Sequence, residues 1–422
     1  MFKTENFLKY VLPMYIISPM ITLGNFGFSL GEILTFFYGV MFLLLPKKQA
    51  ALPKIVLLFF VTIIVARLGA MMNSLNYPIP FNYSKFIFLF ILLIQIISYY
   101  IGRNSAWTAS QIMAHKATKY LAFAVFALAV VYIASDATTR GRLVYIFASG
   151  FDELRTAAPR FPGLGINANL YAYFVFVFFL FSLKNYFDHT TNFWLPFFCF
   201  GIIVLCASKT VIILAFMALL VFSIYYLLRN SREGELKTGK RRPVIMFSLI
   251  VGLGIFVFIA SQIPVITEYI IIFQRFDDLL GSNGDYNSLN DRYELWGLGL
   301  ERVRMAPILG IDVVQADLLS DSVPLYFVNP HNEFIFYWMS HGILGLLAYF
   351  ILPFFMMIRN CFPKFRLVWV LLYFSLLIQM MFDSAFQSLK FQFFIFLIIG
   401  LNFMELGLKK NEEWTKAQPQ ST

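Results

Sequence analysis

The chain has 422 residues, of which 59% are hydrophobic, 13% are charged and 51 are phenylalanine. This composition excludes a soluble globular protein, because runs of about 20 apolar residues recur and each can cross a hydrocarbon core of roughly 30 Å as a helix. The net charge is +10, and the basic residues that produce it lie mostly in short loops between these runs. Such a distribution is the positive-inside signal of a membrane protein, so the basic charge does not indicate nucleic-acid binding.

An all-α polytopic membrane protein is therefore predicted, with about twelve transmembrane helices. Basic residues in alternate loops place both termini in the cytoplasm. A single integral membrane domain then accounts for residues 1–422, apart from two longer outward loops at 136–166 and 263–333. The spans are expected at about 7–23, 28–45, 54–72, 85–101, 120–135, 167–183, 193–206, 209–228, 243–262, 334–358, 366–382 and 391–408.

The larger outward loop is expected to be partly helical. Capping residues occur between Ser288 and Asp291, a helical period then continues to Met305, and Pro307 and Gly310 end it. One face of this helix is expected to carry Arg292, Trp296, Gly299 and Val303. A cation beside an indole at a membrane surface is, taken alone, more simply an interfacial anchor.

A polar cluster ending in Glu333 runs directly into the tenth apolar span and contains His331. An imidazole with an ordinary pKa near 6.5 is well suited to take or give a proton at working pH, and this one is expected at the water–lipid boundary. The alternative is that His331 only caps the helix. The other histidines are expected in cytoplasmic loops or inside a span: His115, His189 and His341.

Cations on the outward side oppose the positive-inside rule and need another explanation. Many can form exposed ion pairs with nearby carboxylates, which contribute little. Lys209 differs from these cations. Ser208, Lys209 and Thr210 are almost the only polar residues between two apolar runs. The other outward cations are Arg140, Arg142, Arg155, Arg160, Arg275, Arg292, Arg302 and Arg304.

Cations around one histidine suit a reaction on a phosphate-bearing lipid. Arginine and lysine bind a diphosphate leaving group and stabilise the charge that develops on it. No carboxylate or His/Cys cluster in the sequence has the spacing of a metal site. Separately, Arg67 inside the third span is expected to pair with Glu32, because an unpaired charge there is costly.

Three motifs follow one another in the last third of the chain. They are Asp291 to Trp296, Ala306 to Gly310, and His331-Asn332 followed after nine residues by Gly342 to Gly345. Together they resemble the Arg-x-x-x-Trp helix, the Pro-x-x-Gly turn and the His-Asn-x9-Gly-x-x-Gly signature of the O-antigen ligases and related polysaccharide polymerases of the bacterial envelope. Fainter similarities are Arg160 to Gly163, and Ser208-Lys209 where that family usually has Ser-Arg.

The resemblance implies a metal-independent, inverting glycosyltransferase without a cofactor. It would take a glycan from undecaprenyl diphosphate at the periplasmic face of the bacterial inner membrane. In the family's roles, His331 assists the acceptor hydroxyl and Arg292 holds the diphosphate. The further diphosphate ligands would be Lys209, Arg275 and Arg160, and the supporting residues Asn332, Glu333 and Trp296.

Two subtypes of this family are left open by the sequence. A ligase passes the glycan to lipid A core, whereas a polymerase passes it to another lipid-linked repeat, with a chain-length co-polymerase as a candidate partner. The signature leans towards the ligase. The alternative of another class is a lipid-linked oligosaccharide flippase or transporter, which would need polar residues at mid-membrane and often shows internal repeats.

Overall fold

The computed structural model describes residues 4–17, 20–23, 26–44, 52–77, 87–147, 161–163, 168–232, 288–312, 329–362, 365–383 and 388–417. Over these residues the protein is α-helical and polytopic, as predicted. It also contains a short antiparallel hairpin that the sequence did not predict. Its strands are β1 (Met20–Leu23) and β2 (Phe26–Ser29), with Met20 opposite Ser29.

Described helices occur at eleven of the predicted spans, and the span at 243–262 lies outside the described residues. The first span, predicted at 7–23, is helical only as far as Ile17, because residues 20–23 form strand β1. The helices are α1 (Thr4–Ile17), α2 (Leu30–Leu44), α3 (Lys54–Ser74), α4 (Ile87–Arg103), α6 (Lys116–Ala134), α9 (Ala168–Phe187), α10 (Trp194–Leu205), α11 (Lys209–Arg232), α17 (Glu333–Cys361), α18 (Leu367–Phe382) and α19 (Leu389–Ala417). Within the described part of the chain, six are long and apolar enough to cross a membrane: α3, α6, α9, α11, α17 and α19.

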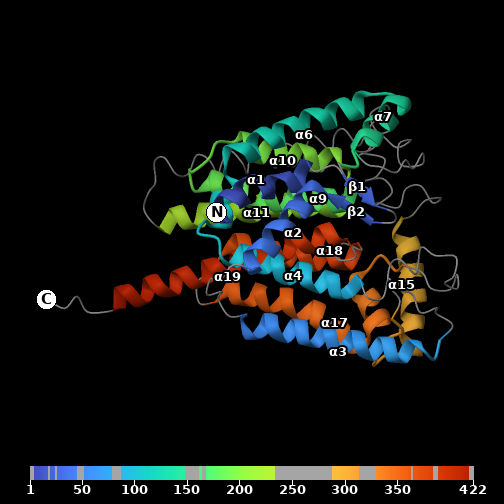
Figure 1. Cartoon of the computed structure of the whole chain (residues 1–422). Coiled ribbons are helices and arrows are strands. Elements are labelled where there is room, and N and C mark those ends of the chain that lie inside the picture. Colours follow the sequence, from blue (N-terminus) through green and yellow to red (C-terminus); the bar gives the residue numbers. More distant parts are fainter. Residues whose placement is uncertain are drawn as a thin grey trace.

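The helices run side by side (Figure 1). Nearly every described side chain of α9 is buried, and so are most of the described side chains of α19. Helix α19 packs against α4, while α17 packs between α3 and α18. Helix α15 (Ser288–Met305) differs from these, because it stands across the ends of the other helices at the right of Figure 1.

Helix α3 shows why this assembly belongs in a bilayer. Its inner face buries Phe59, Phe60 and Ile63, whereas Leu58 and Met72 on the opposite side are 55% and 74% exposed. A soluble monomer rarely presents a continuous apolar helix face of this kind to water. In a bilayer the same face contacts lipid tails without cost.

Arg67 on the inner side of α3 corrects one expectation. Nη1 of Arg67 lies 3.0 Å from Oδ1 of Asp312 and 2.8 Å from Nε2 of His341. The described ion pair is thus with Asp312 in place of Glu32, whose charge acts on Lys390 of α19. The expected intramembrane ion pair exists, but its acidic partner comes from the segment that follows α15.

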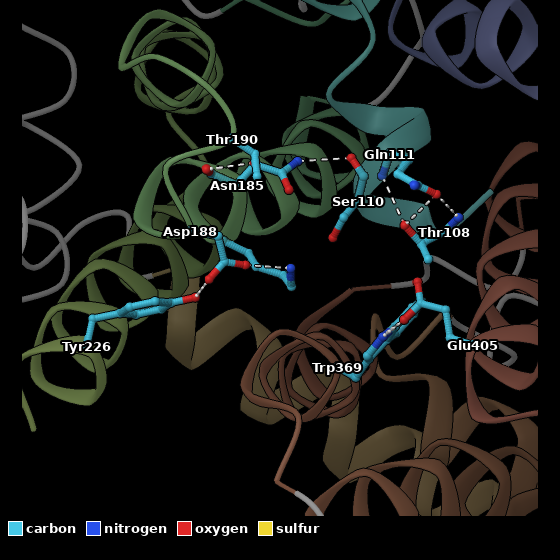
Figure 2. A network of polar contacts seen from close by, with 10 residues as sticks. Thr108, Ser110, Gln111, Asn185, Asp188, Thr190, Tyr226, Trp369 and Glu405 are labelled. Carbon is cyan, nitrogen blue, oxygen red and sulfur yellow. Dashed lines mark hydrogen bonds and ion pairs between the residues drawn. The ribbon is translucent and has the colours of Figure 1, made fainter. Parts of the chain in front are cut away.

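A polar network joins α5 (Ala109–Met113) to α9, α18 and α19 (Figure 2). The carboxylate of Glu405 accepts from the Ala109 N–H at 3.0 Å and from the Trp369 indole at 2.9 Å. Nδ2 of Asn185 donates to the Ser110 carbonyl at 2.9 Å. Because Trp369 is near the first residue of α18, this network lies at the end of the bundle opposite to the last residue of that helix.

Candidate functional site

The first half of α15 lies against the last residue of α18. Nη1 of Arg292 donates to the Phe382 carbonyl, and the Trp296 ring lies 6.0 Å from the Phe382 ring. A carbonyl in the last turn of a helix lacks an intrahelical partner and carries the negative end of the helix dipole. A guanidinium has five N–H donors. One of them anchors Arg292 here, and the described residues supply no hydrogen-bond acceptor for the others.

His331 lies immediately before α17 in an uncommon backbone conformation. Its φ is 48°, in the left-handed region that Asn, Asp and His tolerate best among residues other than glycine. Its N–H donates to Oδ1 of Asn329 at 2.9 Å. Asn332, not His331, caps α17, since its Oδ1 accepts from the Ile335 N–H at 3.1 Å. The alternative that His331 caps the helix is therefore wrong, since Asn332 has that role and His331 precedes the cap.

The surroundings of His331 favour its neutral form. Burial is the largest influence and lowers the pKa of His331 below its ordinary value. The guanidinium of Arg292 lowers this pKa further, while the carboxylate of Asp383 raises it. A neutral imidazole at neutral pH is the form that accepts a proton.

Asp383 is a member of this group that was not predicted from the sequence. It is the C-cap residue of α18 and is only 5% exposed. Nε2 of Gln379 lies 3.3 Å from its Oδ2, and its carboxylate acts electrostatically on His331. A nearby carboxylate stabilises the imidazolium that forms when a histidine takes a proton. The available signal was a single acidic residue directly after an apolar span.

Asp383→Asn is expected to move the acidic limb of the pH–rate profile to lower pH. The change removes the charge that raises the pKa of His331 and leaves the lowering effect of Arg292 in place. A base with a lower pKa stays unprotonated to lower pH, so the limb lies below that of the wild type. The measurement is kcat/KM of purified protein across the limb, which reports the free enzyme's base. An acidic limb that stays at the wild-type pH, or that moves to higher pH, would show that Asp383 does not raise the pKa of His331.

Lys209, the first residue of α11, lies at the same end of the bundle as Phe382. Helices α11 and α18 pack together, and the rings of Tyr225 and Phe365 are 6.0 Å apart near one end of the pair. Lys209 is 16 residues before Tyr225, and Phe382 is 17 residues after Phe365. At 1.5 Å per residue these stretches span about 24 Å and about 26 Å, so both reach the same level.

The remaining predicted residues divide into two groups. Arg160 and Arg275 lie outside the described residues. Glu333 is fully buried as the first residue of α17. A carboxylate at this position interacts favourably with the positive end of the helix dipole. Asn332 and Glu333 thus hold the start of the helix that follows His331.

The two glycine-containing motifs contact each other directly. Three backbone hydrogen bonds of 2.9 to 3.1 Å join the turn after α15 to α17, where Gly342 breaks the helix with a φ of 67°. A Cβ on Gly342 would lie 2.0 Å from the Ile308 carbonyl oxygen. The three bonds run from Ile311 N to Met339 O, from Asp312 N to Ser340 O and from Ile343 N to Pro307 O. The motifs therefore form one structural unit beneath the site.

Gly342→Ala is expected to lower the thermal midpoint of the purified protein by several degrees. The new methyl group meets a carbonyl, and its residue must hold a left-handed conformation that alanine disfavours. Gly297→Ala on α15 is the matched control, because a Cβ there has nothing within 4 Å. Alanine is the better helix former, so the control should equal or exceed the wild type. Equal midpoints for both variants would contradict the close contact at Gly342.

These features define an integral membrane protein of the polytopic helical class, with a histidine, an arginine and a carboxylate gathered at one end of its bundle. Residues 194–350 match the family described as O-antigen ligase. The chain is similar to that family over this segment, which is less than half of its 422 residues. The matched segment contains Lys209, Arg292 and His331, whereas Asp383 lies beyond it. No curated protein matches the chain.

Proposed function

We propose that this protein transfers a glycan from undecaprenyl diphosphate to an acceptor hydroxyl at the periplasmic face of the bacterial inner membrane. One observation carries the proposal: within a segment similar to this family, an arginine and a histidine of lowered pKa lie together at one end of an apolar bundle. Such a pair would supply the base and the positive charge that transfer from a diphosphate requires, which supports the proposal.

In the proposed reaction the acceptor oxygen attacks the anomeric carbon as the glycosidic bond to the diphosphate breaks. His331 takes the proton of the acceptor hydroxyl, and the bonding electrons leave with the diphosphate. Arg292 and Lys209 stabilise the charge of that leaving group, and Arg275 and Arg160 are proposed as further ligands. Attack from the face opposite the leaving group inverts the configuration at the anomeric carbon.

Charge distribution supports the proposed orientation. The end of the bundle that contains Glu405 is rich in basic residues, which favour the cytoplasmic side. Both termini are then cytoplasmic, and the end with His331 faces the periplasm. The basic residues at or near the Glu405 end are Arg103, Lys116, Lys184, Arg229, Arg359 and Arg366.

The acceptor distinguishes the two reactions of this family. We propose the ligase reaction, with lipid A core as the acceptor, because the matched family is described as O-antigen ligase. Purified protein supplied with the lipid-linked glycan and lipid A core should form glycosylated lipid A. Elongation of the lipid-linked glycan in place of this product would assign the polymerase reaction. Movement of the intact donor across a vesicle bilayer without transfer would instead favour a transporter.

Transfer is expected to continue in excess EDTA. Within the described ranges, no group of three or more His, Cys, Asp or Glu side chains could hold a metal ion. Arg292 and Lys209 are proposed to stabilise the charge of the leaving group in place of a metal ion. The check is the initial rate before and after chelation, with Mg²⁺ added back as a control. A rate that falls with EDTA and returns with Mg²⁺ would contradict metal-independent transfer.

A further inference from the structure

A buried group of polar side chains packs near the candidate site and takes no part in the proposed reaction. It consists of Arg67 on α3, Asp312 after α15 and His341 on α17, and we call it the Arg67 unit. The side chains of Arg67 and Asp312 are 2% and 0% exposed. Because a guanidinium only donates hydrogen bonds, Nε2 of His341 accepts from it at 2.8 Å. The unit therefore ties three separate segments of the chain together.

Helix α3 and the turn that follows it also hold the end of α15 directly. The Tyr77 hydroxyl donates to the Met305 carbonyl at 3.0 Å, and Nδ2 of Asn73 donates to the Gly310 carbonyl at 2.7 Å. These contacts and the Arg67 unit all involve Met305, the last residue of α15, or the few residues that follow it. The C-terminal end of α15 is consequently pinned against α3 and α17.

The rest of α15 extends from this fixed end to the candidate site. At Gly299 an added Cβ would lie 2.7 Å from Ile335 and 3.2 Å from Pro330, which flank His331 in the chain. Farther along, Arg292 contacts the end of α18. Arg292 lies about 20 Å before Met305 at 1.5 Å per residue. A tilt of about 3° at the pinned end would therefore move Arg292 by about 1 Å.

A buried ion pair is a poor device for stability alone. Desolvation of both charges offsets much of their attraction, and apolar residues of similar shape often stabilise a protein as well or better. A buried pair does, however, disfavour arrangements in which either charge lacks its partner. The Arg67 unit thus selects one docking of the segment after α15 on α3 and α17.

We infer that Arg67, Asp312 and His341 are positioning residues that set the tilt of α15 and thereby hold Arg292 beside His331. The inference rests on the proposed function, in which these two side chains act on the same reaction. A misplacement of about 1 Å can reduce a rate about 100-fold, because proximity and orientation supply a large part of catalysis. The three residues would therefore affect turnover without touching the substrate.

The first test is the double variant Arg67→Met with Asp312→Leu, which removes both charges together and leaves neither buried alone. Transfer per mole of folded, monodisperse protein is expected to fall at least about 10-fold. The matched control is Trp369→Phe with Glu405→Gln, which breaks a buried polar contact in the network at the other end of the bundle (Figure 2). The control should keep its activity per folded molecule.

A second pair of variants keeps the ion pair and changes only its third member. His341→Gln retains an acceptor for the Arg67 guanidinium, whereas His341→Phe retains a ring of comparable size without one. We expect His341→Gln to keep most of the turnover and His341→Phe to lose it. Equal activity per folded molecule in both variants, with the Arg67→Met and Asp312→Leu double variant also active, would overturn the inference.

A distance measurement tests positioning independently of catalysis. Spin labels on Glu294 and Met381, both exposed, report the separation of α15 and α18 once Cys199, Cys206 and Cys361 have been replaced. The double variant should broaden or shift this distance distribution, and the control should not. An unchanged distribution would overturn the inference. A shifted distribution with no loss of transfer in His331→Asn would leave the positioning intact and refute the proposed function instead.

Discussion

His331→Asn is expected to reduce glycan transfer by about two to four orders of magnitude, the usual contribution of a positioned general base. Asparagine suits this test because it tolerates the left-handed φ of 48° at this position. The backbone before α17 and the Asn332 cap should therefore persist. What the variant lacks is a group that can take the acceptor's proton. Initial rates of purified protein, with saturating donor and acceptor, measure the effect.

His189→Asn supplies a matched control for this substitution. His189 also has a left-handed backbone, with a φ of 60°, and follows α9 beside the network at the opposite end of the bundle. The same chemical change in the same conformation should leave transfer unaffected there. If His331→Asn transfers glycan at the wild-type rate, His331 is not the base. If both variants lose activity with their folded yield, the effect is on folding.

Arg292→Lys is expected to reduce transfer by about two to three orders of magnitude, the range seen when one donor to a developing charge is removed. Lysine keeps the positive charge but lacks the planar fork that donates in several directions at once. In the structure one N–H of Arg292 anchors the side chain on the Phe382 carbonyl, so the diphosphate needs the others. An ammonium on a flexible chain cannot reproduce both contacts in one geometry.

Arg292→Gln adds a pH readout that separates charge from geometry. Arg292 lowers the pKa of His331, so its neutral replacement should raise that pKa and move the acidic limb of kcat/KM to higher pH. Arg292→Lys should leave the limb close to its wild-type position. Arg304→Lys, on an exposed part of α15, is the control and should change neither rate nor limb. Wild-type turnover by Arg292→Lys would remove Arg292 from the proposed diphosphate site.

Local signals in the sequence predicted the helices well, because each depends on residues close together in the chain. Apolar length and flanking charge located the spans, and the capping and breaking residues around α15 indicated where it ends. The hairpin of β1 and β2 was not predicted, because hydropathy reports burial in an apolar medium and does not distinguish a strand from the end of a helix.

The motifs were recognisable in sequence, but their physical reason is tertiary. Gly342 matched a signature, yet only the structure shows that the turn after α15 packs into its helix break. His331 stood out by residue type, whereas its lowered pKa depends on Arg292 and Asp383 from two other helices. Asp383 had no distinguishing neighbours in the chain.

The sequence by itself determined the class of membrane protein, the course of most spans and the residue types that suit diphosphate chemistry. These follow from hydrophobicity, helical periodicity and side-chain chemistry, which are local properties. Only the tertiary structure decided which charged and polar groups meet. Arg67 and His341 are separated by 274 positions in the chain, and Arg292 and Phe382 by 90. Their pairing follows from the way α3, α15, α17 and α18 pack, because a buried charge must find its partner in space rather than along the sequence.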